Sequence, residues 1–252
     1  MNRQPLGEHM QIIKLDATDS TNVFLKNLSV QKTLIDFTTV VAKHQVKGRG
    51  QRGSSWYSEE GKNLTFSVFK KVDSLDVGHQ FGISMCTSLA LYKCLKQYNI
   101  PGLFVKWPND IMSGDKKVCG ILIENTLSGG VIESSIIGIG LNVNQTTFEG
   151  LEKASSLQLI SGQAFNLEEL LANIVLVLKH QFNEFQKNGF DMLKEAYEDV
   201  LFRKDIPSTF EDSKNQRFTG IIRGVSKIGR LQIELEKGCT VNFDLKEVSL
   251  LN

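Results

Sequence analysis

The stretch from Gly48 to Trp56 holds the residue types that bind an anion most directly. Three glycines alternate with two arginines in the order Gly-Arg-Gly-Gln-Arg-Gly, and a tryptophan ends the stretch. Glycine lets the backbone approach a ligand closely, and successive backbone N–H groups can form a concave anion site. Arginine adds a fixed charge with a planar fork that suits phosphate or carboxylate. The spacing is neither that of a Walker A loop nor that of a dinucleotide-binding fingerprint, and the alternative is a flexible basic loop without a ligand.

Two further groups of residues combine charge with unusual backbone freedom. The string Lys-Trp-Pro-Asn-Asp at positions 106–110 packs a cation, an aromatic ring, an amide and a carboxylate into five residues. Its proline has no N–H for a central strand, so the chain must leave the sheet there. Lys117 directly precedes the next predicted strand, which contains Gly120. The strand that returns from it contains Gly138 and Gly140, where a ligand or a neighbouring backbone can approach closely.

The segment Asp19-Ser20-Thr21-Asn22 is dense in side chains that cap helices and form turns. Apolar residues follow it at positions 23, 24 and 28, which predicts a short helix that begins near Ser20. One interpretation is that this segment only caps the helix. The alternative is that its hydroxyl and amide groups bind a polar ligand.

The elements that position these residues follow from hydrophobic periodicity and turn signals. We expect strands over residues 12–15, 38–44, 64–69, 103–107, 118–125 and 131–144, and helices over 81–98, 167–185 and 190–202. Residues 145–165 are expected to be loop. The hairpins favour an α+β fold with a mixed, largely antiparallel sheet. From about Asp205 five short β runs predict a small barrel, so we expect domains at 1–204 and 205–252.

The composition is that of an ordinary globular protein. The 252 residues are 41% hydrophobic and 23% charged, and the formal net charge of +1 gives no global field that attracts nucleic acid or membranes. The four cysteines form no C-x-x-C pair, so neither a zinc site nor a disulfide framework is indicated. A reducing cytoplasm fits this cysteine usage. No signal peptide and no membrane-spanning run is predicted.

In their order and spacing these motifs resemble those of the biotin–protein ligases, from about Asp16 to the C-terminus. The matching strings are Asp19–Asn22, the Gly48–Trp56 loop, Gly61–Leu64, Lys106–Asp110, Lys117–Glu124 and Ile139–Asn144. The C-terminal barrel also fits, because the last domain of this family is SH3-like. The resemblance implies the catalytic fold shared with lipoate ligases and class II aminoacyl-tRNA synthetases.

The resemblance further implies a two-step reaction. Biotin and MgATP give biotinyl-5′-AMP, and the ε-amine of a lysine on a biotin carboxyl carrier domain of a carboxylase then attacks it. Implied biotin contacts are Ser20, Thr21, Asn22, Gln45, Gly48, Arg49, Gly50, Gln51, Lys117 and Gly120. Implied ATP or adenylate contacts are Arg49, Arg52, Trp56, Lys106, Asn109 and Asn142, with Lys117 and Arg49 catalytic and Asp110 on Mg²⁺.

The chain departs from the family pattern at two positions, and other functions stay open. Gln51 and Ser54 stand where the family usually has arginine, so retention of the adenylate is in question. About fifteen residues precede the first motif, so a DNA-binding repressor role is not expected. The alternatives are a lipoate or octanoate ligase of the same superfamily and a non-catalytic biotin sensor or regulator. The chain is expected to act as a monomer or a homodimer.

Overall fold

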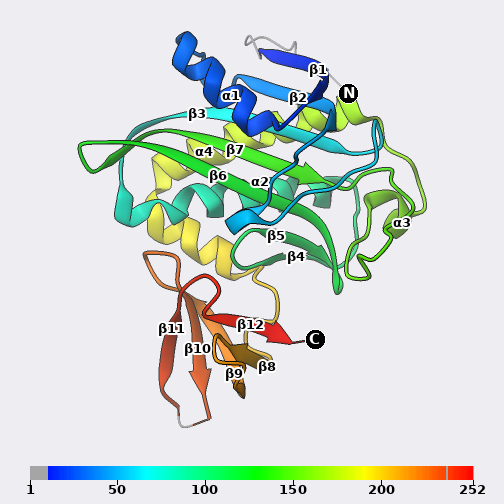
Figure 1. The fold of residues 1–252 in the computed structure, drawn as a ribbon. Helices are drawn as coiled ribbons and strands as arrows, with labels where there is room; N and C mark the ends of the chain where they lie inside the picture. Colours follow the sequence, from blue (N-terminus) through cyan, green and yellow to red (C-terminus); the bar gives the residue numbers. More distant parts are fainter. Residues whose placement is uncertain (1–10, 237, 252) are drawn as a thin grey trace.

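The larger part of the chain is built on a seven-stranded mixed sheet (Figure 1). This computed structural model describes residues 11–236 and 238–251. The sheet has the order β1-β2-β3-β7-β6-β5-β4, in which β1 and β2 are parallel and every other pair is antiparallel. Its strands are β1 (Ile12–Thr18), β2 (Thr39–Gln45), β3 (Leu64–Asp76), β4 (Leu103–Lys106), β5 (Asp110–Ser113), β6 (Lys116–Ser128) and β7 (Val131–Leu141).

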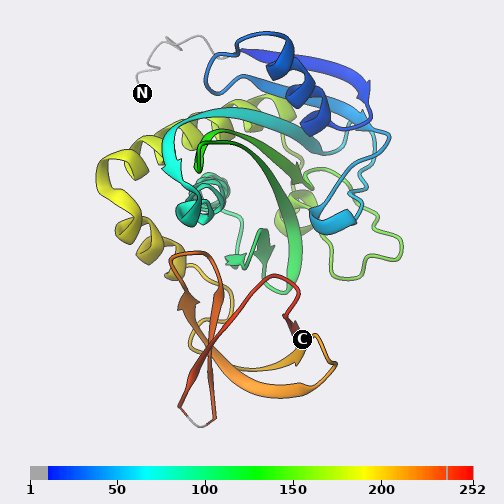
Figure 2. The same ribbon diagram turned by 60° about the vertical axis from the view of Figure 1, so that its left-hand side comes forward.

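Helices cover the two faces of this sheet differently (Figure 2). Helix α1 (Thr21–Gln31) packs on β2, β3 and β7 through a small cluster that includes Leu25 and Val40. Helices α2 (Phe81–Gln97) and α4 (Leu167–Glu198) pack against each other and cover the main core. The expected α+β fold with a largely antiparallel sheet is therefore confirmed.

Some predicted boundaries were wrong for identifiable reasons. Strand β5 was missed because it has only four residues and begins with Asp110; it forms through pairing with β4 and β6. Helix α3 (Leu157–Ser161), capped by the Ser156 side chain, lies inside the predicted loop. The two helices predicted after residue 166 are confirmed, because the backbone of α4 is non-helical at Gly189 and divides it into two helical segments; the second ends at Glu198 and not at residue 202. None of the helices in the described residues has the length and apolar character of a membrane span.

The C-terminal part is a five-stranded antiparallel sheet with the order β11-β10-β9-β8-β12. Its strands are β8 (Pro207–Asp212), β9 (Arg217–Val225), β10 (Leu231–Leu235), β11 (Thr240–Phe243) and β12 (Val248–Leu251). They confirm the five predicted β runs and are consistent with an SH3-like domain. The predicted domain boundary at 204/205 falls in the connection between α4 and β8.

Candidate active site

A cavity of about 220 Å³ lies on the face of the large sheet where α1 begins. It is formed by the start of α1, the end of β2 and the loop that follows it, Phe66 of β3, the β4–β5 turn with the first residue of β5, and parts of β6 and β7. The cavity is lined by Ser20, Thr21, Asn22, Gln45, Arg49, Gly50, Gln51, Ser54, Ser55, Trp56, Phe66, Asn109, Asp110, Lys117, Gly120, Ile121, Leu122, Gly138, Ile139 and Gly140. Five of the six matching strings from the sequence therefore converge on one cavity, and only the string Gly61–Leu64 contributes no lining residue among those described.

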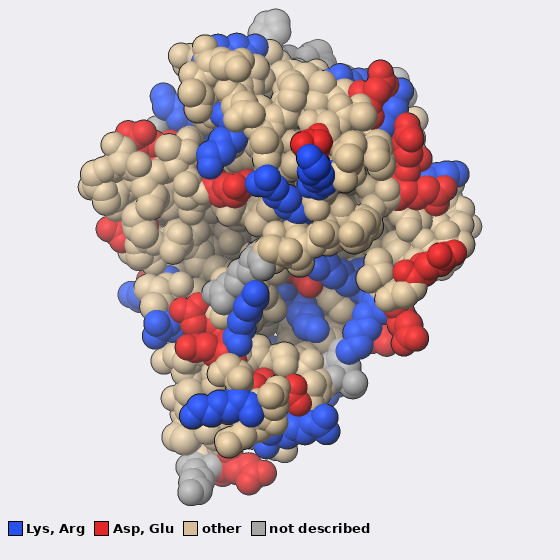
Figure 3. Space-filling model, in the orientation of Figure 1, with Lys and Arg blue, Asp and Glu red and all other residues tan. Residues whose placement is uncertain are grey.

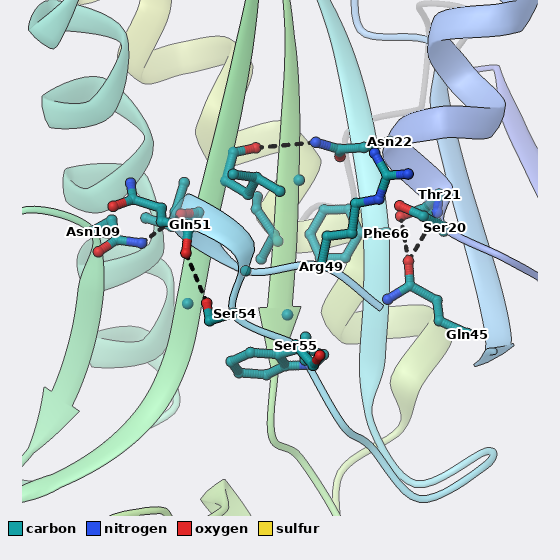
Figure 4. Close-up of a pocket in the computed structure, with 18 of the residues that line it drawn as sticks. Ser20, Thr21, Asn22, Gln45, Arg49, Gln51, Ser54, Ser55, Phe66 and Asn109 are labelled. Atoms are coloured by element: carbon teal, nitrogen blue, oxygen red, sulfur yellow. Dashed lines mark hydrogen bonds between the residues drawn. The ribbon is translucent and has the colours of Figure 1, made fainter. Parts of the chain in front are cut away.

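One end of the cavity carries a buried chain of hydrogen bonds (Figure 4). The Gln45 side-chain oxygen accepts from the backbone N–H of Thr21 at 2.8 Å and lies 3.1 Å from the Thr21 hydroxyl. The Ser67 hydroxyl oxygen lies 2.7 Å from the Thr21 hydroxyl and 2.6 Å from the Asn22 amide oxygen. The Asn22 amide nitrogen in turn donates to Glu124 at 2.8 Å and to the Leu122 carbonyl at 3.3 Å.

These hydrogen bonds determine which polar groups remain available to a ligand. A hydroxyl has one hydrogen to donate, and an amide oxygen can only accept. The two hydroxyl hydrogens of Thr21 and Ser67 serve three oxygen–oxygen contacts: Ser67 donates to Asn22, and Thr21 donates either to Ser67 or to Gln45. In both arrangements the Gln45 oxygen accepts from the Thr21 backbone N–H. Because the Gln45 oxygen is held in this way, its NH₂ group is left as a donor towards the cavity. Ser20 caps no backbone group of α1, so its hydroxyl is also available.

The floor of the cavity is made of backbone without side chains. Gly120 of β6 pairs with Gly140 of β7, and Gly138 lies two residues further along the same face. The Trp56 ring occupies this floor, so a Cβ on Gly140 would lie 2.3–2.7 Å from its indole atoms. A Cβ on Gly138 would lie 2.3 Å from the Asn22 amide oxygen. A ligand or a neighbouring backbone was expected close to Gly138 and Gly140; in the structure the groups that approach them are the side chains of Asn22 and Trp56.

The centre of the cavity holds an ion pair that joins β6 to β5. The Lys117 ammonium lies 2.7 Å from the Asp110 carboxylate and 5.6 Å from the centre of the Trp56 ring. About a third of the Lys117 side chain is exposed. With Arg49 also in the lining, the cavity has two cations and one carboxylate. This excess of positive charge suits an anionic ligand.

The glycine-rich loop between β2 and β3 forms a closed hairpin over the cavity. The Gly50 N–H donates to the Ser54 carbonyl at 2.7 Å, and the Trp56 N–H donates to the Gly48 carbonyl at 3.0 Å. In Figure 4, Arg49 extends from this loop across the cavity towards Asn22, while Gln51 lies at the opposite end, beside Asn109. The loop therefore brings a cation to one end and a neutral amide to the other.

Four residues predicted for the site are not in the cavity lining. Gly48 lies behind it, where a Cβ would meet the Trp56 carbonyl oxygen at 2.3 Å. Lys106 lines a neighbouring cavity, and its pKa is lowered chiefly by burial. Asn142 is buried and donates to the Ser155 carbonyl at 3.0 Å, and its predicted contact with adenine stays a prediction. The side chain of Arg52 lies outside the described part of the structure.

Several residues of the site were not singled out from the sequence. The apolar wall is formed by Phe66, Ile121, Leu122 and Ile139, while Ser67 and Glu124 support the polar end. The apolar wall could have been predicted from β6 and β7, because alternate residues of a strand lie on the same face and the apolar residues there neighbour the glycines. No local pattern indicated Ser67, because its role depends on the pairing of β3 beside α1.

The described residues offer no preformed metal site. They contain no group of three or more His, Cys, Asp or Glu side chains able to hold an ion. Asp110 is the one carboxylate in the lining of this cavity, and it is paired with Lys117. The metal role predicted for Asp110 therefore stays a prediction, and no step below passes through a metal.

The fold and the cavity together define a class of enzyme that binds an anionic, partly apolar molecule on an open sheet face. Residues 15–142 match the model of the biotin/lipoate A/B protein ligase family, and this chain belongs to that family. The chain is 30% identical over 190 residues to the biotin–[acetyl-CoA-carboxylase] ligase of Paracoccus denitrificans, covering 73% of this chain and 78% of that protein.

Two other similar proteins extend the likeness over more of the chain. The bifunctional ligase/repressor BirA of Escherichia coli is 28% identical over 224 residues, which cover 87% of this chain and 68% of that protein. The structure of the biotin protein ligase from Aquifex aeolicus in complex with biotin and ATP superposes with a TM-score of 0.77 at 27% identity. That match covers 96% of this chain and 98% of the other, so it includes the C-terminal barrel.

Proposed function

We propose that this protein activates biotin with ATP and transfers it to the ε-amine of a lysine on the biotin carrier domain of a carboxylase. The observation that carries the proposal is one cavity with a hydrogen-bonding end, an apolar wall, and a cationic centre at Lys117. Biotin has the same three parts in the same order: a ureido head, an apolar ring and chain, and a carboxylate. Membership of the family and the similarity to named biotin ligases support this assignment.

The polar end of the cavity suits the ureido head. The free NH₂ of Gln45 and the hydroxyl of Ser20 can donate to the ureido oxygen, and Thr21 with Asn22 holds Gln45 through the buried chain. The apolar rings of biotin would then lie along Phe66, Ile121 and Ile139. Gly138 carries no side chain and so leaves room above β7 for the Asn22 amide, which supports this polar end.

The cationic centre suits the first chemical step. A biotin carboxylate oxygen attacks the α-phosphorus of ATP, the bond to the bridging oxygen breaks, and pyrophosphate leaves. The obstacle is the approach of two anions, which Lys117 reduces by placing positive charge between them. The catalytic role proposed for Arg49 requires its side chain to move from the Asn22 end to this centre. Trp56, already packed on Gly120 and Gly140, can cover the adenine side of the product.

The second step forms the amide bond. The neutral lysine amine of the carrier attacks the acyl carbon of biotinyl-5′-AMP, the acyl–oxygen bond breaks, AMP leaves with the electron pair, and the nitrogen loses one proton to solvent. The hairpin Gly48–Trp56 covers the cavity, which would protect the mixed anhydride from water until the carrier arrives.

The test is pyrophosphate release from the purified protein with MgATP, adding biotin or lipoate in turn, with and without a biotin carrier domain. We expect release that depends on biotin, continues when carrier is added, and leaves biotin on the carrier lysine, as seen by mass spectrometry. Release that depends on lipoate alone would assign the protein to the other branch of the family. Release with neither acid would overturn the proposal.

A further inference from the structure

The turn between β4 and β5 is anchored on both sides, and one anchor lies in the C-terminal barrel. On the sheet side, the Ile121 N–H donates to the Asn109 carbonyl at 3.0 Å, and the Asn109 amide donates to the Ile121 carbonyl at 2.7 Å. On the barrel side, the indole N–H of Trp107 donates to the Gly229 carbonyl at 2.8 Å. The residues of the turn thus connect the candidate active site to the barrel.

The barrel residue that receives this bond is packed tightly against the large domain. Gly229 has φ +86°, and a Cβ there would lie 2.4 Å from the ring of Phe81, the first residue of α2. Phe81 itself makes an edge-on contact with the buried Tyr197 ring at 5.7 Å. Hydrogen bonds from Gly229 and Ser226 to the Ser226 and Arg230 carbonyls, at 2.9 and 2.8 Å, close the turn between β9 and β10. This turn therefore docks as a formed unit, with room for glycine alone at its contact point.

Further contacts connect the barrel and the segment before it to the end of α4 and to β4. Residues 200–202 run beside β4, with the Val105 N–H donating to Val200 at 2.9 Å and the Phe202 N–H donating to Val105 at 2.8 Å. The Glu198 carboxylate accepts from the Val225 N–H at 2.7 Å. The Glu198–Val225 bond holds the end of β9, directly before the Ser226–Arg230 turn, and the Trp107–Gly229 bond joins that turn to the β4–β5 turn.

The space between the barrel and the β4–β5 turn borders the nucleotide end of the site. A cavity of about 340 Å³ lies there, lined by Gln51, Lys106 and Asn109 of the large domain and by Lys246 and Ser249 of the barrel. Figure 3 shows this hollow between the two parts, with Lys and Arg side chains gathered around it. Gln51 and Asn109 also line the main cavity, at the end away from Thr21 and Gln45 (Figure 4).

We propose that Trp107 is a positioning residue, whose indole N–H latches the barrel against the β4–β5 turn and so sets the geometry of the nucleotide end of the active site. The inference rests on the proposed function for its kinetic consequence. Without the latch, the turn that carries Lys106 and Asn109 keeps only its sheet-side anchor, and the barrel residues around Lys246 lose their fixed distance from it. The hydrogen-bond chain at the biotin end involves α1, β2, β3 and β6, so it is independent of the latch.

The test is Trp107→Phe, which keeps an aromatic ring and removes the N–H, assayed in the full chain by biotin-dependent exchange of pyrophosphate into ATP. We expect the KM for ATP to rise about fivefold, the factor that one ordinary hydrogen bond supplies, with the KM for biotin unchanged. Hydrogen–deuterium exchange over residues 226–230 should become faster in the same variant. An unchanged KM for ATP, or an equal rise in both KM values, would overturn the inference.

Two glycines of the barrel provide a matched second comparison. Gly229→Ala places a methyl group against Phe81 and should reproduce the kinetic effect of Trp107→Phe. Gly238→Ala adds the same methyl group at a similar φ of +75°, with no atom within 4 Å, and should leave both KM values unchanged. Equal effects of the two alanines would show that barrel strain, and not docking, controls the site. If the wild-type protein lacks exchange activity, the proposed function fails, while hydrogen–deuterium exchange still decides whether the latch exists.

Discussion

The ammonium of Lys117 lies 2.7 Å from the carboxylate of Asp110, across the pairing of β6 with β5. Asp110 directly follows the β4–β5 turn, so this ion pair connects the cationic centre of the site to the turn that the barrel contacts. The Lys117 ammonium also lies 5.6 Å from the centre of the Trp56 ring, at the centre of the cavity.

Lys117→Ala is expected to lower biotinyl-adenylate formation at least about 100-fold, because one preorganised charge at the reacting anions is lost. Lys116→Ala is the matched control, since the neighbouring side chain lies outside the cavity lining and donates to the Glu152 carbonyl. Adenylate formation is measured by pyrophosphate release, and folding by circular dichroism. Near-normal release by a folded Lys117→Ala protein would remove the assigned role.

Ser67→Ala is expected to raise the KM for biotin on the order of tenfold. The substitution leaves the Asn22 amide oxygen without its hydroxyl donor, and a buried polar group without a partner costs about 1–3 kcal/mol. Ser88→Ala is the control, because the Ser88 hydroxyl is buried and has no hydrogen-bond partner in the described residues. Isothermal titration with biotin measures the effect, and equal affinities for the two variants would refute the hydrogen-bond chain.

Gly140→Ala and Gly138→Ala are expected to separate the two ends of the site. The first substitution displaces the Trp56 ring and should weaken ATP binding, while the second displaces the Asn22 side chain and should weaken biotin binding. Both alanines lie on the same face of β7, so each variant controls for the strand distortion of the other. The KM values for biotin and for ATP are measured in both variants. If the ratio of the KM for biotin to the KM for ATP were the same in the two variants, the assignment of the two ends would be contradicted.

Lys106→Met is expected to raise the melting temperature near pH 7 while lowering activity. Burial lowers the pKa of Lys106, and the charges of Lys153 and Lys117 lower it further, although Asp110 acts in the opposite direction. The folded chain therefore loses this proton at a lower pH than the unfolded chain, whose lysine pKa is near 10.5, and stability rises with pH between the two values.

The gain in melting temperature from Lys106→Met should accordingly shrink as the pH approaches 10.5. Thermal unfolding of both proteins at pH 7 and at pH 10 checks this, with Lys26→Met on the exposed side of α1 as the control. A gain that is independent of pH would mean that the methionine improves packing and that the buried charge is not the cause.

The amino-acid sequence alone determined the parts of the site that are local along the chain. The glycine-arginine loop, the helix start at Ser20–Asn22 and the lysine before Gly120 follow from residue types and short spacings. The long strands and helices follow from hydrophobic period, as for α2 and β7. Strand β5 and helix α3 were not predicted, because segments of four or five residues are too short to show a hydrophobic period.

Only the tertiary structure decided which of these parts meet. The Lys117–Asp110 pair depends on the register of β6 with β5, and the contact of Gly138 with Asn22 depends on the position of α1 over β7. Asn142 lies in a matching motif, yet its amide is engaged by Ser155, and Trp107 bonds to the barrel. Such contacts join residues far apart in the chain, so they are set by strand pairing and domain docking, which local sequence patterns do not encode.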